Sequence, residues 1–430
     1  MKKPAFHLMS MVIQAALWVF IRIDYYFTKS RVSVSDHKQF ADPYSVYNTL
    51  RERGAILRSY SNNGWMILGY KEVEELFKDR RLSNDVKHNA FFTRLLDSAS
   101  GDLPFPLIEN PTIVQADPPD HTRLRKLVVK GFAHKYVQSL APKIEHLVDE
   151  LLQEIPDGAT QVDITSALTK PLPAIVIAEM MGVPVHERHY FEQWSEAFVG
   201  FAVLDKPEGI RVAAQGWQDM RQYLETLVET KRSNPGEDLI SHLIAAEEEH
   251  DKLSLEEIYS TCIVLLVAGH ETTTRLIGNC LYLLLQHPKQ MDMARQDEAL
   301  LMNAVEETLR YEPPLQYTVR FITESFEFGQ HQFKHNQTAL VSIAAANRDP
   351  EINNNPDTFD ITRNNIKHFS FGHGIHLCLG MSLARLETKI ALQKLFTRFP
   401  EMRLAQDTPD WEPNPMFRGL QTLIVRTSRH

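Results

Sequence analysis

The stretch that decides the fold is Phe371-Gly372-His373-Gly374-Ile375-His376-Leu377-Cys378-Leu379-Gly380. Two glycines ahead of Cys378 allow a tight backbone approach to a flat ligand, and a positive φ where one is needed. From Leu379 to Leu395 apolar and charged residues alternate with helical period, so Cys378 is expected just before a helix begins. The positive end of a helix dipole favours the thiolate form of a cysteine at such a place. The segment therefore predicts a thiolate in a glycine-lined loop.

Three interpretations of Cys378 compete. A thiolate with open space above it suits axial ligation of haem iron, where it pushes electron density towards cleavage of the O–O bond. A free cysteine is otherwise most often a small buried hydrophobe. Zinc could use His373, His376 and Cys378, but it would want a fourth ligand, and the sequence has no second Cys/His cluster. We favour haem because further motifs in the chain agree with it.

The ten residues resemble the haem-binding loop of the cytochrome P450 family, whose bacterial pattern is Phe-Gly-x-Gly-x-His-x-Cys-x-Gly. All fixed positions are present in order, and the resemblance runs from about Phe40 to Thr427. It implies a mainly α (α+β) fold, a triangular helical bundle with small β-sheets around a buried haem. It also implies a set of loop residues that contact the haem, with the cysteine as metal ligand: Phe371, Gly372, His376, Cys378 and Gly380.

The whole chain has 430 residues, of which 43% are hydrophobic and 23% charged, and a formal net charge of -9. This is ordinary globular composition with material for a large core. No Pro/Gly/Ser-rich linker interrupts the chain, so a single haem domain is expected over residues 36–430. Only three cysteines occur, which argues against a disulfide framework and predicts a cytoplasmic location. The scattered Lys and Arg residues show no footprint of nucleic-acid binding.

Residues 1–35 form an extension ahead of this domain. The apolar stretch 6–23 has no convincing signal-peptide cleavage site. Polar residues also interrupt it too often for a spanning helix, namely His7, Ser10, Gln14 and Arg22. They lie on one side of a helical wheel, which predicts an amphipathic helix. Two alternatives stay open: the helix lies in a membrane interface on the cytoplasmic side, as a peripheral contact, or it packs on the protein itself.

A long apolar helix is expected to begin after Ser254, which forms a capping box with Glu257, and to stop before Pro288. Near its middle, Ala268-Gly269-His270-Glu271-Thr272-Thr273-Thr274 lowers helix propensity and permits a kink where a backbone bond opens. An acid beside a hydroxyl at such an opening can relay protons to dioxygen.

This segment is similar to the family's Ala-Gly-x-(Asp/Glu)-Thr oxygen-activation motif. The resemblance implies that Glu271 and Thr272 are catalytic and that Ala268 and Gly269 border the cofactor. As an alternative, Glu271 pairs with a nearby base in a structural role.

Cationic residues elsewhere fit the carboxylate side chains of haem. His121 and Arg125 are four residues apart, hence on one helical face, and an arginine can bind a carboxylate in bidentate fashion. The alternative is a solvated basic face, since further basic residues are close by. By resemblance, Arg320 and His376 also hold a haem propionate.

The resemblance also implies a substrate pocket. Residues 82–114 are irregular and rich in apolar side chains, which indicates a functional loop and a candidate lid. The expected pocket residues come from four parts of the chain: Phe91, Phe92, Leu107, Val267, Tyr317, Val319 and Phe417.

Glu307 and Arg310 match the family's Glu-x-x-Arg helix and can form a charge pair on one helical face. By resemblance the pair is structural, and it holds the core beneath the haem together with Asn347 or Arg348. The alternative is an exposed helical ion pair, worth only about 0.3–0.5 kcal/mol.

The sequence therefore predicts a haem-thiolate monooxygenase that uses haem b and dioxygen to oxidise an apolar organic substrate. Electrons are expected from NAD(P)H through a separate ferredoxin or flavodoxin with its reductase, received on a basic patch near Arg363 and Lys367. We expect a monomer. Two alternatives are a peroxygenase, which the intact acid–alcohol pair disfavours, and a non-catalytic haem sensor or carrier, which needs no proton relay.

Overall fold

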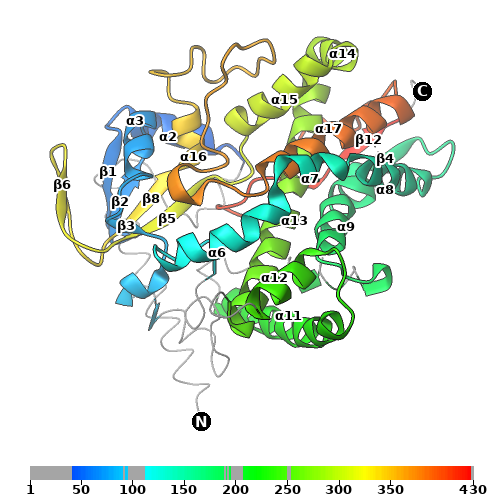
Figure 1. The fold of residues 1–430 in the computed structure, drawn as a ribbon. Coiled ribbons are helices and arrows are strands. Elements are labelled where there is room, and N and C mark those ends of the chain that lie inside the picture. Colours follow the sequence, from blue (N-terminus) through cyan, green and yellow to red (C-terminus); the bar gives the residue numbers. More distant parts are fainter. Residues whose placement is uncertain are drawn as a thin grey trace.

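The computed structural model describes residues 41–90, 93–94, 112–187, 190, 193–194, 207–248 and 253–427. Helices fill most of the molecule, and the largest β-sheet lies at one side of it (Figure 1). The expected mainly α fold with small sheets is confirmed. The N-terminal extension lies outside the described residues, and so do the expected pocket residues Phe91, Phe92 and Leu107. No helix within the described ranges is long and apolar enough to cross a membrane.

The longest helix of the described part, α13 (Leu255–Gln286), runs through the helical side of the molecule (Figure 1). It begins as predicted, with a reciprocal capping box between Ser254 and Glu257. Nearly all its side chains are buried, as expected for a helix that is apolar on every side. Residues 268–274, where the sequence permits a kink, lie within the continuous α-helix.

Several helices pack directly on α13: α9 (Pro171–Met180), α11 (Pro207–Ser233), α12 (Leu239–Glu248), α14 (Pro288–Gln296), α15 (Glu298–Tyr311) and α17 (Met381–Arg398). The other helices with eight or more residues are α2 (Pro43–Arg51), α6 (Asp120–Val128) and α8 (Ala141–Gln153), and shorter ones are α3 (Tyr70–Leu76), α7 (His134–Ser139) and α16 (Ile343–Asn347). Because α17 contacts α8, α13 and α15, the helix that follows Cys378 is fixed from several sides.

The largest sheet has the strand order β1-β2-β8-β5-β3, with β1 (Ile56–Ser59), β2 (Gly64–Ile67), β8 (Thr338–Ser342), β5 (Tyr317–Ile322) and β3 (Leu82–Ser83). β1 and β2 form the antiparallel hairpin that Asn63-Gly64 predicts, and Asn63 has a φ of 44°. A Cβ on Gly64 would collide with the carbonyl of Thr338, so only glycine lets β2 approach β8 here. The register therefore depends on this glycine.

Three smaller sheets complete the described β structure. They contain β4 (Gln161–Asp163), β12 (Ile424–Arg426) and β9 (Arg403–Leu404); β6 (Phe326–Phe328) and β7 (His331–Phe333); and β10 (Asp410–Trp411) and β11 (Leu420–Thr422). The hairpin of β10 and β11 closes with a bond from the Glu412 amide to the Gly419 carbonyl. It presents residues 412–419 as one turn.

The predicted pair of Glu307 and Arg310 lies in the interior, since both side chains have 0% exposure. The Nε and Nη2 atoms of Arg310 each donate to a Glu307 carboxylate oxygen at 2.7 Å. Arg310 also donates to the carbonyls of Pro356 and Thr358. An exposed helical pair is thereby excluded. Removing one partner of such a buried pair leaves an uncompensated charge, which typically costs about 3–5 kcal/mol.

Asn347 connects this pair to the cysteine loop. Its carbonyl accepts a bond from Arg310, and its side chain donates to Leu309 and Ser370 and accepts from the Phe369 amide at 2.7 Å. Of the two residues that the sequence left open, Asn347 fills this role, whereas Arg348 lies over the ring of Tyr44.

Arg363 does not belong to an exposed basic patch, contrary to the sequence-based expectation. Its side chain is 14% exposed, and its Nε donates to Glu307 at 2.9 Å. It also donates to backbone carbonyls of residues 354, 355 and 358. Its charge is therefore used inside the fold.

Candidate functional site

The cysteine loop turns twice through left-handed backbone, because Gly372 and Gly374 both have a φ of 72°. A Cβ on Gly374 would lie 2.8 Å from the Phe77 carbonyl, so the loop also needs glycine for its close approach to this neighbour. The Cys378 amide donates to the Phe371 carbonyl at 2.8 Å, and α17 begins at Met381. The predicted order of glycine loop, cysteine and helix is present.

The Cys378 side chain is exposed, yet burial is the largest influence on its pKa. Protein therefore surrounds the sulfur, and its exposed surface faces an internal space. Burial raises the pKa of Cys378 above the ordinary thiol value, although the amides of Gly380 and Met381 and the charges of Arg125 and Arg385 act in the opposite direction. The protein alone does not create the expected thiolate. A coordinated metal would, because a ligating thiol is deprotonated.

The buried helix α13 also carries accessible surface near its middle. Ala268 is exposed and Thr272 half-buried, although most other side chains of this helix are buried. They are four residues apart and share one face. The Thr272 hydroxyl donates to the Ala268 carbonyl at 2.8 Å. By contrast, a Cβ on Gly269 would meet Ile177 of α9 at 3.2 Å, which gives this glycine a role in helix packing.

The predicted cationic residues come together beside the loop. The rings of His121 and His376 lie 4.3 Å apart, and Arg125 donates to the Leu377 carbonyl at 2.6 Å. Arg320 is 8% exposed and donates only to Thr318 and the Val319 carbonyl, with no ion pair to a carboxylate of the described residues.

The electrostatics of this cluster favour an anionic ligand. Burial, followed by the charges of His121, Arg320 and Arg125, lowers the pKa of His376 to about 3. Burial also lowers the pKa of Arg320 to about 10. The Nε2 atom of the buried His121 has no hydrogen-bond partner. Since buried cations and donors are normally paired, the cluster fits the two carboxylates of a haem.

Glu271 makes the ion pair that the sequence left open as an alternative. It is buried, and Arg275 one turn later donates to its carboxylate and, at 2.8 Å, to its carbonyl. Burial alone would raise the pKa of Glu271, but the charges of Arg275 and His270 outweigh it and lower the pKa. The sequence analysis missed Arg275, although the Glu–Arg spacing of four residues could have indicated it.

The expected pocket residues separate into two groups. Val267 is buried next to Ala268, and Phe417 lies half-buried in the turn 412–419. Tyr317 and Val319 instead pack with Leu50 in a hydrophobic cluster between the sheet and α2. Side chains alternate along a strand, so Thr318 shares the face of Arg320, while Tyr317 and Val319 point the other way. Thr318 is therefore the residue that β5 brings to the site.

The zinc interpretation has no ligand set in the described ranges, where no three His, Cys, Asp or Glu side chains gather around a common point. A glycine loop with one cysteine, a group of histidines and arginines beside it and an acid–alcohol pair on a long buried helix together fit the site of a haem-thiolate oxygenase.

Comparison with known proteins agrees with this class. The family model for cytochrome P450 matches residues 66–425. The chain belongs to the cytochrome P450 family. It is 40% identical to cytochrome P450 107B1 of Saccharopolyspora erythraea over 392 residues, 90% of this chain and 95% of that protein. It is 39% identical to 6-deoxyerythronolide B hydroxylase of the same organism over 394 residues, 90% of this chain and 96% of the relative.

Solved structures show the same relationship. The cytochrome P450 PksS of the Bacillus subtilis bacillaene polyketide synthase superposes with a TM-score of 0.81 at 36% identity, covering 92% of this chain and 100% of that one. The tirandamycin C-bound monooxygenase TamI gives 0.82 at 36% identity, with 91% and 99% covered. The protein is accordingly a haem b-dependent monooxygenase that uses dioxygen and a redox partner to oxidise an organic substrate.

Proposed function

We propose that Cys378 would ligate the haem iron and that His121, Arg125, Arg320 and His376 would hold the haem propionates. The observation that carries this assignment is the buried Arg320, which has no ion pair to a carboxylate of the described residues, beside the buried His121, whose Nε2 atom has no hydrogen-bond partner. Haem with a thiolate ligand supplies the activation of dioxygen with two electrons. The chain's own residues supply binding, orientation and protons.

We further propose that Thr272 and Glu271 deliver these protons. The Thr272 hydroxyl lies on the face of α13 that opens onto the internal space, where it can exchange its bond to the Ala268 carbonyl for one to a reacting oxygen. Glu271 is next to it in the chain and ionised through its pair with Arg275, so it can accept a proton and pass it on.

For the substrate we propose a large, uncharged and mostly apolar natural product of polyketide type. Two relatives support this class by their names, 6-deoxyerythronolide B hydroxylase and the polyketide biosynthesis cytochrome P450 PksS. In this chain the expected pocket residues near α13 are Val267 and Phe417, which offer apolar contacts.

A panel of ligands tests the substrate class. The purified protein should show a low-spin to high-spin shift with 6-deoxyerythronolide B or a similar macrolactone, because an apolar ligand above the haem excludes water from it. Testosterone and vitamin D3 are the comparison ligands, because they are apolar but differ in shape from a macrolactone. A palmitoleoyl acyl carrier protein tests whether a carrier-bound acyl chain is the substrate. A shift with the acyl carrier protein alone would contradict the proposal and assign a tethered fatty-acyl substrate.

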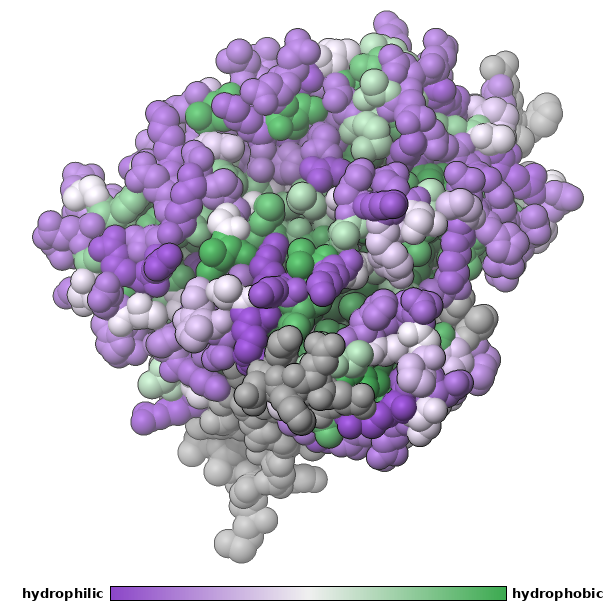
Figure 2. Space-filling model, viewed as in Figure 1, coloured by the Kyte–Doolittle hydropathy of each residue, from purple (hydrophilic) through white to green (hydrophobic). Residues whose placement is uncertain are grey.

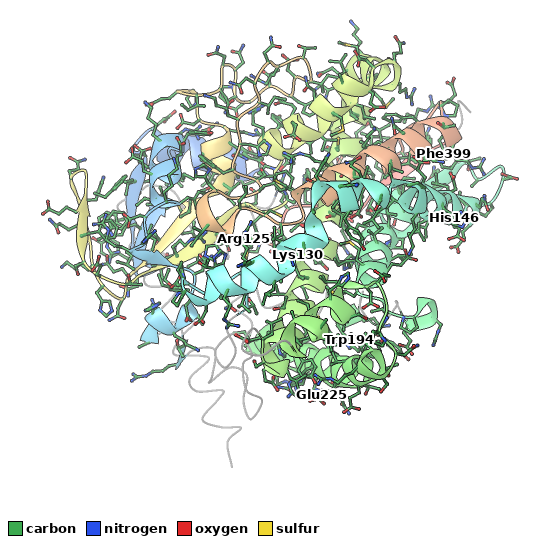
Figure 3. The ribbon with its side chains drawn as sticks, in the orientation of Figure 1. Arg125, Lys130, His146, Trp194, Glu225 and Phe399 are labelled. Carbon is green, nitrogen blue, oxygen red and sulfur yellow. The ribbon has the colours of Figure 1, made fainter. Side chains whose placement is uncertain are left out.

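We propose that an acidic ferredoxin docks on the surface formed by α6 and the cysteine loop. Arg125 of α6 contacts the loop through Leu377. Lys126 of α6 is exposed, and so is Lys130 of the 3-10 helix Val129–Phe132 that follows it; Figure 3 labels Arg125 and Lys130. Val129 and Ile375 add exposed apolar side chains, and Figure 2 shows hydrophobic surface in the middle of this face with hydrophilic residues around it. Apolar contacts among basic residues suit an acidic electron carrier.

Charge reversal tests this docking surface. The double substitution Lys126→Glu and Lys130→Glu should raise the KM for ferredoxin by about 10-fold or more, mainly through slower association. Lys334→Glu, at the residue after β7, is the control and should leave the KM unchanged. An equal KM for the double variant and the control would exclude this surface.

A further inference from the structure

Arg275 connects two parts of the molecule that are far apart in the sequence. It is a buried residue of α13, and its Nη1 donates to the carboxylate and the carbonyl of Glu271. Its Nη2 donates to the carboxylate of Glu412, which lies in the turn after β10. One guanidinium is thus shared by an acid on the buried helix and an acid on the C-terminal turn.

The turn is shaped around this side chain. The guanidinium lies 5.4 Å from the centre of the Phe417 ring, as in a cation–π contact. A Cβ on Gly419 would collide with the aliphatic part of Arg275, so glycine there gives the side chain its path. Phe417 itself pairs with Leu315 as a β-bridge. The same turn therefore presents a candidate pocket residue and holds the arginine of the acid.

Four charged or titratable groups face Glu271. Arg275 and His270 belong to α13, Lys170 follows the π-helix Thr165–Thr169, and Glu412 belongs to the turn. Burial raises the pKa of Glu412, and the charge of Glu271 adds to this effect, while Arg275 and Lys170 oppose it. Of the two acids, Glu271 is the one held ionised and Glu412 the one that takes up a proton more readily.

We propose that Arg275 is a positioning residue for proton delivery, which fixes the carboxylate of Glu271 and ties it through Glu412 to the turn that bears Phe417. A substrate that displaces Phe417 then alters the ion pair of the relay acid. This inference rests on the proposed role of Glu271, and it adds to that role a link between pocket and relay.

Thermal unfolding of the haem-loaded protein tests the fixation of Glu271 without turnover. Arg275→Met removes the largest charge that lowers the pKa of Glu271. We expect burial, the largest influence, then to raise the folded pKa above the unfolded value against the smaller charges of His270 and Lys170. The contribution of Glu271 to the stability of this variant is then present at low pH and is lost as pH rises through the folded pKa. Relative to wild type, Tm should fall by about 2–4 °C more near pH 8.5 than near pH 5.5. In the wild type the pKa is lowered, so Glu271 adds no such loss.

Second substitutions separate the two acids. Adding Glu271→Gln to Arg275→Met should remove the larger part of the pH-dependent loss. Adding Glu412→Gln should remove a smaller part, because the Glu412 side chain is 21% exposed and that of Glu271 only 8%. Glu412→Gln should lower Tm in the wild type but not further in Arg275→Met, since the tether is already gone. Arg398→Met, which removes a surface pair with Asp157, is the control and should show no pH dependence.

A loss of Tm in Arg275→Met that is equal at both pH values would overturn the fixation of Glu271. Additive losses from Arg275→Met and Glu412→Gln would overturn the tether. Turnover with a surrogate ferredoxin, its reductase and NADPH gives the third readout, peroxide released per NADPH. In Arg275→Met this ratio should change with pH over the range in which Tm changes. A pH-dependent Tm together with a constant peroxide ratio would mean that Arg275 fixes Glu271 but that Glu271 does not deliver protons, which would refute the proposed role of Glu271.

Discussion

Replacing Cys378 by serine should abolish monooxygenase activity and remove the red-shifted band that the reduced carbonyl complex shows with thiolate ligation. A serine hydroxyl is a poorer electron donor to iron than a thiolate, and the geometry of the loop otherwise stays the same. The measurement is the absorption spectrum of the reduced protein under carbon monoxide, together with its haem content. A variant that keeps both the band and the haem would refute the assignment of Cys378.

The other two cysteines provide matched controls. Cys262 and Cys280 have 0% exposure, and burial raises the pKa of each to about 12, so both remain neutral thiols in the core of α13. Replacing either by alanine should leave the carbonyl band in place and lower only the stability.

Thr272→Ala should keep consuming reducing equivalents but divert them to hydrogen peroxide. The hydroxyl that can hand a proton to the reacting oxygen is gone, while the apolar contacts of the pocket remain. General acid–base groups typically contribute about 10²–10⁴-fold, so product per NADPH should fall by far more than a packing change would cause. Glu271→Gln should instead slow the whole cycle, because fewer protons reach the site.

Thr273→Ala is the matched control for this pair of variants. Thr273 is the next residue of α13, but its side chain is buried, so it lies away from the exposed face of Thr272. Its loss should leave the ratio of product to NADPH unchanged. The ratio is measured with any ligand that gives a spin-state shift. Wild-type coupling in both Thr272→Ala and Glu271→Gln would remove the relay and leave the two residues as parts of a helix.

The sequence was most informative where a structure depends on neighbouring residues. The left-handed glycines of the cysteine loop, the capping box before α13 and the hairpin at Asn63 are local features, and each is where the pattern predicts it. The burial of the helix pair at Glu307 and Arg310 followed from the family resemblance and not from the spacing, which is equally compatible with a surface pair.

Long-range arrangements could not be predicted in the same way. Whether Tyr317 or Thr318 faces the site depends on the pairing of β5 with β8, and a shift by one residue reverses it. Glu412 is 137 residues from Arg275, and no local pattern connects them. The sequence suggested that Arg363 belongs to a surface patch, because nothing near it in the chain indicates its partner. The structure pairs it with the buried carboxylate of Glu307, far back in the chain.

The contact between Gly374 and the Phe77 carbonyl has a consequence for how firmly the cofactor is retained. Phe77 is the C-cap residue of α3 and packs in the hydrophobic cluster of the large sheet. Phe369, two residues ahead of the cysteine loop, belongs to the same cluster. The loop can thus keep its shape only while the sheet is packed. We therefore expect local unfolding of the sheet to loosen this loop, and with it the hold on the haem, even while the helical core stays folded.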